Sequence, residues 1–168
     1  MKSLKQHDRN LLSISSIDYN SWNDKCFFKY LLQNFFDYKY FISINRRPIS
    51  NYSFVIENAE KKLSIENIIW SHYGKRFAEF SWFGESKNIH NELEGLIVDF
   101  WNLFEETSLI FTNDLDYFIK LDIQNMYWED LMKNLNSFII FKGTEDDVIW
   151  IGKSNSLNFP TIDLNDKF

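Results

Sequence analysis

Two stretches of the chain carry apolar residues at helical spacing. In the first, Ser21-Trp22-Asn23-Asp24 resembles a capping box and precedes the apolar residues Phe27, Phe28, Leu31, Leu32, Phe35 and Phe36. In the second, from about Ile89 to Glu106, the apolar stripe is Ile89, Leu93, Leu96, Ile97, Phe100 and Phe104, and Asn88 can cap its start. Glu105 and Glu106 lie where the helix dipole disfavours acid, which indicates an early helix end or a functional use of these carboxylates.

Shorter patterns predict three further helices. Ser64 to about Gly74 places Ile65, Ile68, Ile69 and Tyr73 on one side. Leu115–Leu121 has a shorter apolar face. In Tyr127–Leu135 the apolar residues are Trp128, Leu131 and Leu135, and the polar ones are Glu129, Asp130 and Lys133.

Runs rich in β-branched and aromatic residues predict the strands. They are a short strand around Leu11 to Ile17, then Tyr40–Ile44, Tyr52–Ile56, Phe77–Phe83, Leu109–Thr112, Ser137–Lys142 and Val148–Gly152. Gly143–Asp147 joins the last two as a hairpin loop, and Arg46-Arg47-Pro48 reads as an exposed turn. Within Phe77–Phe83, the pairs Phe80/Trp82 and Phe77/Phe83 point to opposite faces, so we expect both faces of the sheet to be covered.

These elements predict an α+β fold, with a mostly antiparallel sheet packed with several helices, because helices and strands do not strictly alternate. An α/β sheet is the alternative. A chain of 20.3 kDa can bury up to about 70% of its extended surface, enough for a core without disulfides or metals. We expect one domain over residues 1–168, with residues 1–18 an irregular lead-in and residues 153–168 also peripheral.

The cysteine content and the N-terminus predict a soluble, cytoplasmic protein. Cys26 is the single cysteine, so no internal disulfide can form, and its apolar surroundings predict a buried thiol. Met1 to Asn10 is polar and unlike a secretory signal, and no apolar run approaches the roughly 20 residues that span a bilayer.

Charge is uneven along the chain, whose net charge is −6. Residues 1–84 hold 12 Lys and Arg against 8 Asp and Glu, whereas residues 85–168 hold 6 against 16, which gives +4 and −10. Nucleic-acid binding depends mainly on Lys and Arg contacts to phosphates, so an acidic chain argues against it. We therefore expect a basic protein partner and neither a nucleic acid nor a membrane.

The sequence contains no motif for most kinds of catalysis. The histidines His7, His72 and His90 are too widely separated for a zinc site, and five scattered glycines cannot build a phosphate loop. The carboxylates that could hold Mg²⁺ or act as an acid and base pair are Glu105, Glu106, Asp114, Asp116, Glu145, Asp146 and Asp147. Because acidic pairs in turns are usually solvated, we expect no enzyme activity and no cofactor or metal.

Binding is the remaining class of function, and aromatic content favours it. The chain has 6 Trp, a residue type that anchors many interfaces, and Trp22, Tyr127, Trp128 and Trp150 are candidate anchors. An acidic rim would speed encounter with a basic partner. The predicted partner-binding residues are Glu145, Asp146, Asp147, Asp114, Asp116, Glu129, Asp130 and Trp128.

A small aromatic domain with an acidic second half, no catalytic motif and an Ile-, Asn-, Lys- and Phe-rich composition typical of an A+T-rich gene resembles a known class. It resembles the cytoplasmic immunity proteins of bacterial contact-dependent growth inhibition and related polymorphic toxin systems. That resemblance implies binding to a cognate toxin domain, often a basic nuclease, and blocking of its active site or substrate entry. The alternatives are a structural subunit of a prophage or bacterial assembly, and a carboxylate- or metal-dependent enzyme.

Overall fold

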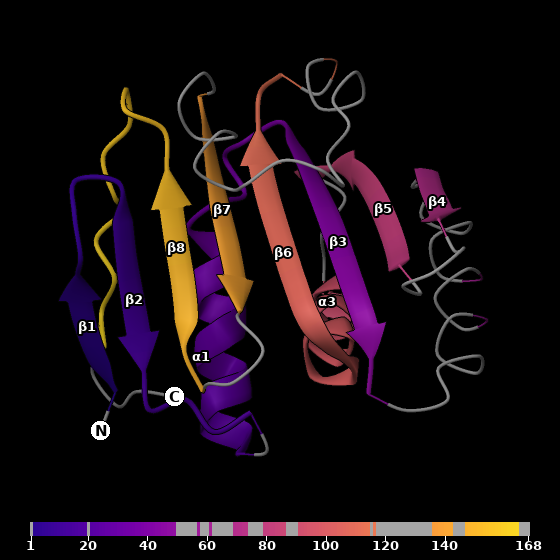
Figure 1. The fold of residues 1–168 in the computed structure, drawn as a ribbon, viewed down its shortest axis with the longest axis horizontal. Coiled ribbons are helices and arrows are strands. Elements are labelled where there is room, and N and C mark those ends of the chain that lie inside the picture. Colours follow the sequence, from indigo (N-terminus) through magenta and orange to yellow (C-terminus); the bar gives the residue numbers. More distant parts are fainter. Residues whose placement is uncertain are drawn as a thin grey trace.

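The structure is a computed structural model that describes residues 2–19, 21–49, 57, 61, 69–73, 79–86, 91–114, 116, 136–142 and 147–164. Within them lie one eight-stranded sheet, in the order β1-β2-β8-β7-β6-β3-β5-β4, and two helices (Figure 1). In chain order the elements are β1 (Ser3–Gln6), β2 (Leu11–Ser15), α1 (Trp22–Gln33), β3 (Tyr40–Pro48), β4 (Ile69–Tyr73), β5 (Glu79–Glu85), α3 (Asn91–Leu103), β6 (Phe104–Thr112), β7 (Ser137–Lys142) and β8 (Ile149–Lys153). Every pair of neighbouring strands is antiparallel.

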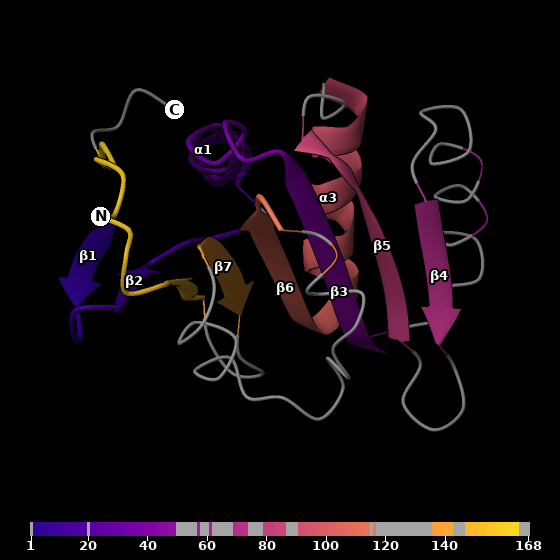
Figure 2. The same ribbon diagram turned by 90° about the horizontal axis from the view of Figure 1, so that it is seen from above.

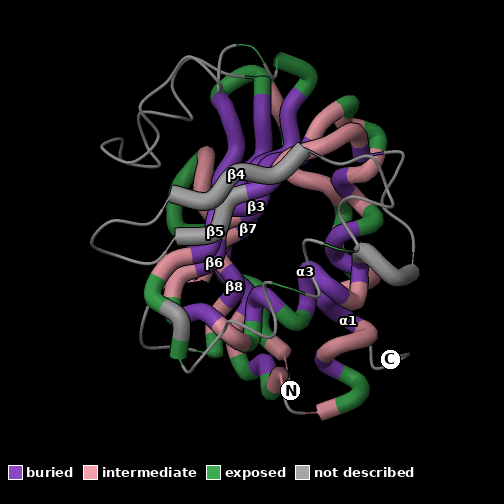
Figure 3. The backbone as a smooth tube through the Cα atoms, turned by 90° about the vertical axis from the view of Figure 1, so that its right-hand side faces the viewer, coloured by how far each residue is buried: buried purple, intermediate pink, exposed green. Residues whose placement is uncertain are grey.

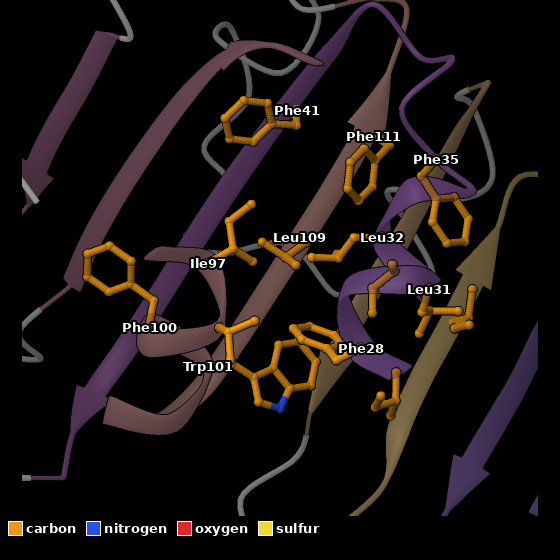
Figure 4. Close-up of a cluster of buried hydrophobic side chains, with 14 of the residues drawn as sticks. Phe28, Leu31, Leu32, Phe35, Phe41, Ile97, Phe100, Trp101, Leu109 and Phe111 are labelled. Atoms are coloured by element: carbon orange, nitrogen blue, oxygen red, sulfur yellow. The ribbon is translucent and has the colours of Figure 1, made fainter. Parts of the chain in front are cut away.

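Both helices lie on the same face of the sheet, and the segment after β8 runs beside α1 on that face (Figure 2). The core between these layers is aromatic: the rings of Phe28 and Trp101 are 4.6 Å apart, and Phe35 lies 5.4 Å from Phe111. Figure 4 shows these side chains converging from α1 and the residues that follow it, from α3 and from β6. The regular apolar face of each predicted helix is thus what attaches it to the sheet.

The opposite face of the central strands is also buried. Ile42, Ile110 and Ile139 are side by side in the register of β3, β6 and β7, and are only 5%, 0% and 3% exposed. Figure 3 shows the buried stretches along these strands. In β5, Trp82 belongs to the core between sheet and helices, whereas its neighbour Phe83 is partly exposed. The expectation from Phe77–Phe83 that both faces are covered is met only in part in β5, where Phe83 is partly exposed, whereas the central strands are buried on both faces.

The α+β class and the antiparallel sheet agree with the prediction, but the described residues contain two helices rather than several. One helix prediction is wrong: of Ser64–Gly74, residues 69–73 form β4, which pairs with β5. The predicted strand Tyr52–Ile56 and helix Tyr127–Leu135 lie outside the described residues, as does Leu115–Leu121 except Asp116.

Other boundaries differ from the predictions. Residues 3–6 of the expected irregular lead-in form the edge strand β1. Arg46 and Arg47 lie within β3 rather than in a turn, Arg47 with a φ of 55° and an ion pair to Glu106 at 3.1 Å. β6 begins at Phe104, directly after α3, so Glu105 and Glu106 lie in a strand and the helix indeed ends early.

The uneven charge along the chain does not become two separate lobes. Strands β6, β7 and β8 come from the acidic half, and they lie between β2 and β3 from the other half. One continuous sheet therefore contains strands from both ends of the chain, and any acidic surface must be defined by individual residues.

Candidate partner-binding surface

One end of the sheet carries an exposed tryptophan and two exposed aspartates on neighbouring chain segments. β2 ends there, and α1 and β8 begin there (Figure 1). Trp22, the first residue of α1, is 76% exposed, the highest value among the large hydrophobic residues described. Asp18 and Asp147 are exposed, and the N–H of Ile17 donates to the Asp147 main-chain carbonyl at 3.3 Å, which attaches the two segments. We call Asp18, Trp22 and Asp147 the Trp22 surface.

The start of α1 is fixed by capping. Ser21 Oγ accepts a hydrogen bond from the N–H of Asp24 at 3.1 Å, as the capping-box pattern predicts. The Ser21 N–H donates to the Asp18 carbonyl at 2.9 Å, closing a turn before the helix. The backbone that carries Trp22 therefore has little freedom, which lowers the entropy cost of using this side chain as an anchor.

Asp24 joins three segments at this end. Its carboxylate accepts a hydrogen bond from the Asp18 N–H at 2.6 Å and forms an ion pair with Lys2 at 2.6 Å. Burial by itself would raise the pKa of Asp24, but the hydrogen bonds from Lys2, from the Asp18 N–H and from Ser21 outweigh it and hold this pKa below its ordinary value. Asp24 is therefore ionised at neutral pH, and its contacts with Lys2, Asp18 and Ser21 fix the backbone at the start of α1.

Two buried polar atoms lie near Asp24. The Tyr19 hydroxyl and the Trp101 indole nitrogen make no hydrogen bond to other described residues, and the two rings are 5.8 Å apart. Figure 4 shows the indole nitrogen turned away from Ile97 and Leu109. Burial raises the pKa of Tyr19 well above its usual value; the charges of Asp147 and Asp24 add to this rise, while the Trp101 indole opposes it. Tyr19 therefore stays neutral.

Lys142, the last residue of β7, lies at the same end. Its ammonium group donates to the carbonyl of Trp101 and is 5.8 Å from the centre of the Trp101 ring. Burial lowers the pKa of Lys142 to about 8, against the opposing charge of Glu105. Since it meets a carbonyl at the end of a helix, its evident role is to cap α3.

The structure separates the predicted acidic residues. Asp114 and Asp116 are exposed beyond the Thr112 end of β6, whereas Asp147 lies beyond the Lys142 end of β7. The strand length between these ends places them more than about 17 Å apart, so they do not form one patch. The main-chain N–H of Asp114 donates to Thr112 Oγ1 at 3.0 Å, which fixes the backbone at this position. Glu145, Asp146, Glu129, Asp130 and Trp128 lie outside the described residues.

The other candidates are less suited to binding or chemistry. Trp150 is half-buried, with Phe141 stacked on it at 6.3 Å, and Tyr127 lies outside the described residues. Cys26 is partly exposed rather than buried, because it lies on the polar side of α1. No group of three or more His, Cys, Asp or Glu in the described part of the chain could hold a metal ion.

Asp18 is the member of the Trp22 surface that the sequence did not reveal. No spacing rule marks an aspartate before a helix cap as exposed. Trp22 did carry a signal, because it shares a helix face with Cys26, Lys29 and Gln33, opposite the apolar stripe.

Among the described residues, the Trp22 surface is the candidate site that we consider further. Neither described helix has the length and apolar character needed to cross a membrane. Comparison with protein-family models, with curated proteins and with solved structures finds no match to this chain.

Proposed function

We propose that this chain is an immunity protein: it binds a cognate toxin domain with a basic surface, such as a nuclease, and blocks the active site or the entry of substrate. One observation carries the proposal, namely Trp22, 76% exposed on a capped helix start, with exposed Asp18 and Asp147 on the chain segments joined there. Tryptophan is enriched among residues that dominate binding energy. Carboxylates beside it suit the Lys and Arg residues of a nucleic-acid-cleaving partner.

The rigidity of this surface supports the same function. Inhibitors that bind tightly usually change little on binding, since ordering a loop costs affinity. Here the hydrogen bonds of Ser21 and Asp24 and the Lys2 ion pair hold the Trp22 backbone in place before any partner arrives. The proposed function involves no catalytic step and no cofactor, and it places the protein in the cytoplasm with its toxin's target.

Co-expression with a toxin tests the proposal. The probe is the toxin domain encoded next to this chain's gene, expressed from a separate inducible promoter. We expect the chain to restore growth and, as purified protein, to inhibit the toxin's nuclease activity at a one-to-one ratio. Growth arrest and nuclease activity that persist at equal protein levels would contradict the proposal.

A further inference from the structure

The C-terminal segment of the described chain is attached differently from every strand of the sheet. After β8 it turns and runs beside α1, on the helix side of the sheet (Figure 2). Leu157, Phe159, Ile162 and Leu164 are half-buried against the core. No backbone-to-backbone hydrogen bond joins residues 158–164 to another described residue.

Polar contacts gather at the start of this segment. The Ser154 N–H donates to the Ser137 carbonyl at 3.1 Å, and Asn10 donates to the Asn155 side chain at 2.6 Å. Further along, the N–H of Asp163 donates to the Tyr30 hydroxyl of α1 at 3.4 Å. The segment is thus anchored firmly at residues 154–155 and held mainly by apolar side chains from Leu157 onward.

Phe159 covers a lysine and an aromatic ring. Its ring centre is 6.4 Å from that of Phe138 and 5.1 Å from the ammonium nitrogen of Lys153. Lys153 is 4% exposed, and its ammonium donates to Asn10 Oδ1 at 3.2 Å. Burial, together with the charge of Arg9, lowers the pKa of Lys153. Removing Phe159 would return this ammonium to water and uncover Phe138.

We propose that residues 157–164 form a releasable strap. It opens by local release about the Ser154–Asn155 anchor while the sheet and α1 stay folded, and its opening uncovers Phe138 and Lys153. Local opening at a lower free energy than global unfolding is expected for a segment that, among the described residues, is held mainly by apolar side chains. Hydration of Lys153 favours the open form, and burial of Phe159 favours the closed one. The strap is independent of the Trp22 surface.

Proteolysis of the intact chain tests local release. We expect thermolysin, which cleaves before large apolar residues, to cut before Ile162 under native conditions, at a rate that hardly changes in urea below the unfolding transition, since local opening exposes little surface. Cleavage before Ile139, in β7, is the internal reference and should accelerate with urea as global unfolding does. Cleavage before Ile162 that accelerates in parallel with the Ile139 site would overturn the proposal.

Exchange of the strap provides a second test. A specific protease site is inserted between the exposed residues Asn155 and Ser156 and then cleaved. We expect the far-ultraviolet circular dichroism to persist and a fluorescent peptide of residues 156–168 to replace the cleaved strap. A peptide with Phe159→Ala should bind at least tenfold more weakly, whereas Thr161→Ala, at an exposed position, should bind equally. Loss of the sheet signal on cleavage, or equal binding of both altered peptides, would overturn the proposal.

Discussion

The ammonium group of Lys142 donates a hydrogen bond to the main-chain carbonyl of Trp101, so the end of β7 closes the end of α3. α3 has no basic residue in its own last turn. A residue about forty positions further along the chain therefore neutralises the carbonyl end of this helix, and it is also the residue that pairs with Thr107 in the sheet. The contact links the helix layer to the sheet at the end that carries the Trp22 surface.

Lys142 should make stability depend on pH in the alkaline range. Its pKa is about 8 in the folded chain and about 10.4 when unfolded, so between these values the unfolded chain binds more protons and the native state gains stability as pH rises. We expect the free energy of unfolding of the wild type, minus that of Lys142→Met, to rise by about 1 kcal/mol from pH 7 to 9.5, roughly half of what the full pKa difference gives, because solvent screens this partly exposed charge. Urea unfolding of both proteins across this pH range measures the difference.

The control is Lys5→Met, at an exposed position of β1. A plot of its free energy of unfolding against pH should run parallel to that of the wild type. The upper limit of pH 9.5 matters because Tyr19 has a raised pKa and contributes with the opposite sign above about pH 10. Parallel curves for Lys142→Met and the wild type would show that the ammonium is not desolvated.

Asp24→Asn should destabilise the chain at neutral pH. The substitution removes the charge that faces Lys2 and weakens the hydrogen bond from the Asp18 N–H, at a cost of about 1–2 kcal/mol. Because the folded pKa of Asp24 is lowered, its contribution is present above about pH 4, the unfolded value, and is lost as the pH falls through the folded value.

Urea unfolding of Asp24→Asn and the wild type at pH 7 and pH 3 measures this difference, which should narrow at the lower pH. Asp116→Asn, at an exposed position, is the matched control and should stay within about 0.5 kcal/mol at both values. A difference that is constant with pH would mean that Asp24 acts through packing rather than charge.

Tyr19→Phe should leave stability unchanged or raise it by up to about 1 kcal/mol. Apart from the Trp101 indole, which favours its ionised form, the buried hydroxyl has no polar partner in the described part of the chain, so its removal costs the folded chain little and avoids its desolvation. Thermal unfolding provides the measurement. A loss of more than about 1 kcal/mol would show that the hydroxyl makes a stabilising hydrogen bond in the folded chain.

Trp22→Ala should separate binding from folding. Because Trp22 is 76% exposed, its removal should shift stability by no more than about 0.5 kcal/mol. Binding to the cognate toxin domain should weaken by about 2 kcal/mol or more, roughly thirtyfold. Leu4→Ala, at a position 47% exposed on β1, is the control and should bind like the wild type. Unchanged affinity of Trp22→Ala, measured by calorimetry, would remove the Trp22 surface from the proposed interface.

Asp146→Ala with Asp147→Ala should leave the melting temperature nearly unchanged and weaken toxin neutralisation. Loss of a desolvated interfacial charge costs roughly 2–5 kcal/mol of binding. Affinity of the wild type should also fall as salt rises, chiefly through a slower association rate, and less so in the double variant. Surface plasmon resonance at low and high salt measures both. Full protection of toxin-expressing cells by the double variant would contradict this assignment.

The amphipathic helices could be predicted because their apolar faces are regular. Which strands pair with one another could not. In residues 69–73 apolar and polar side chains do not alternate regularly, so the pattern fits a helix as well as a strand. These residues form a strand because they pair with β5. Ser3–Gln6 escaped prediction for a different reason. All four residues of this edge strand are exposed, so no buried face imposes an alternation on them.

The binding surface was less predictable than the fold. The sequence marked Trp22 and Asp147 separately, yet the segments that carry them are joined by the hydrogen bond from the Ile17 N–H to the Asp147 carbonyl. It also grouped Asp114 with Asp147, whereas the length of β6 and β7 keeps them apart. The periodicity of apolar residues predicts which face of a helix or strand is buried. It does not predict which loops lie together at one end of the sheet.

The position of β2 has a consequence for how the chain folds during synthesis. Leu12 and Ile14 are made long before the residues that they face across the sheet, Ile151 and Ile149. Until β8 is made, the hairpin of β1 and β2 has an open edge, and pairing so distant in sequence is slow. Nascent chains that still lack β8 therefore expose a strand edge that can pair with other chains, so the synthesis of β8 lowers the risk of aggregation.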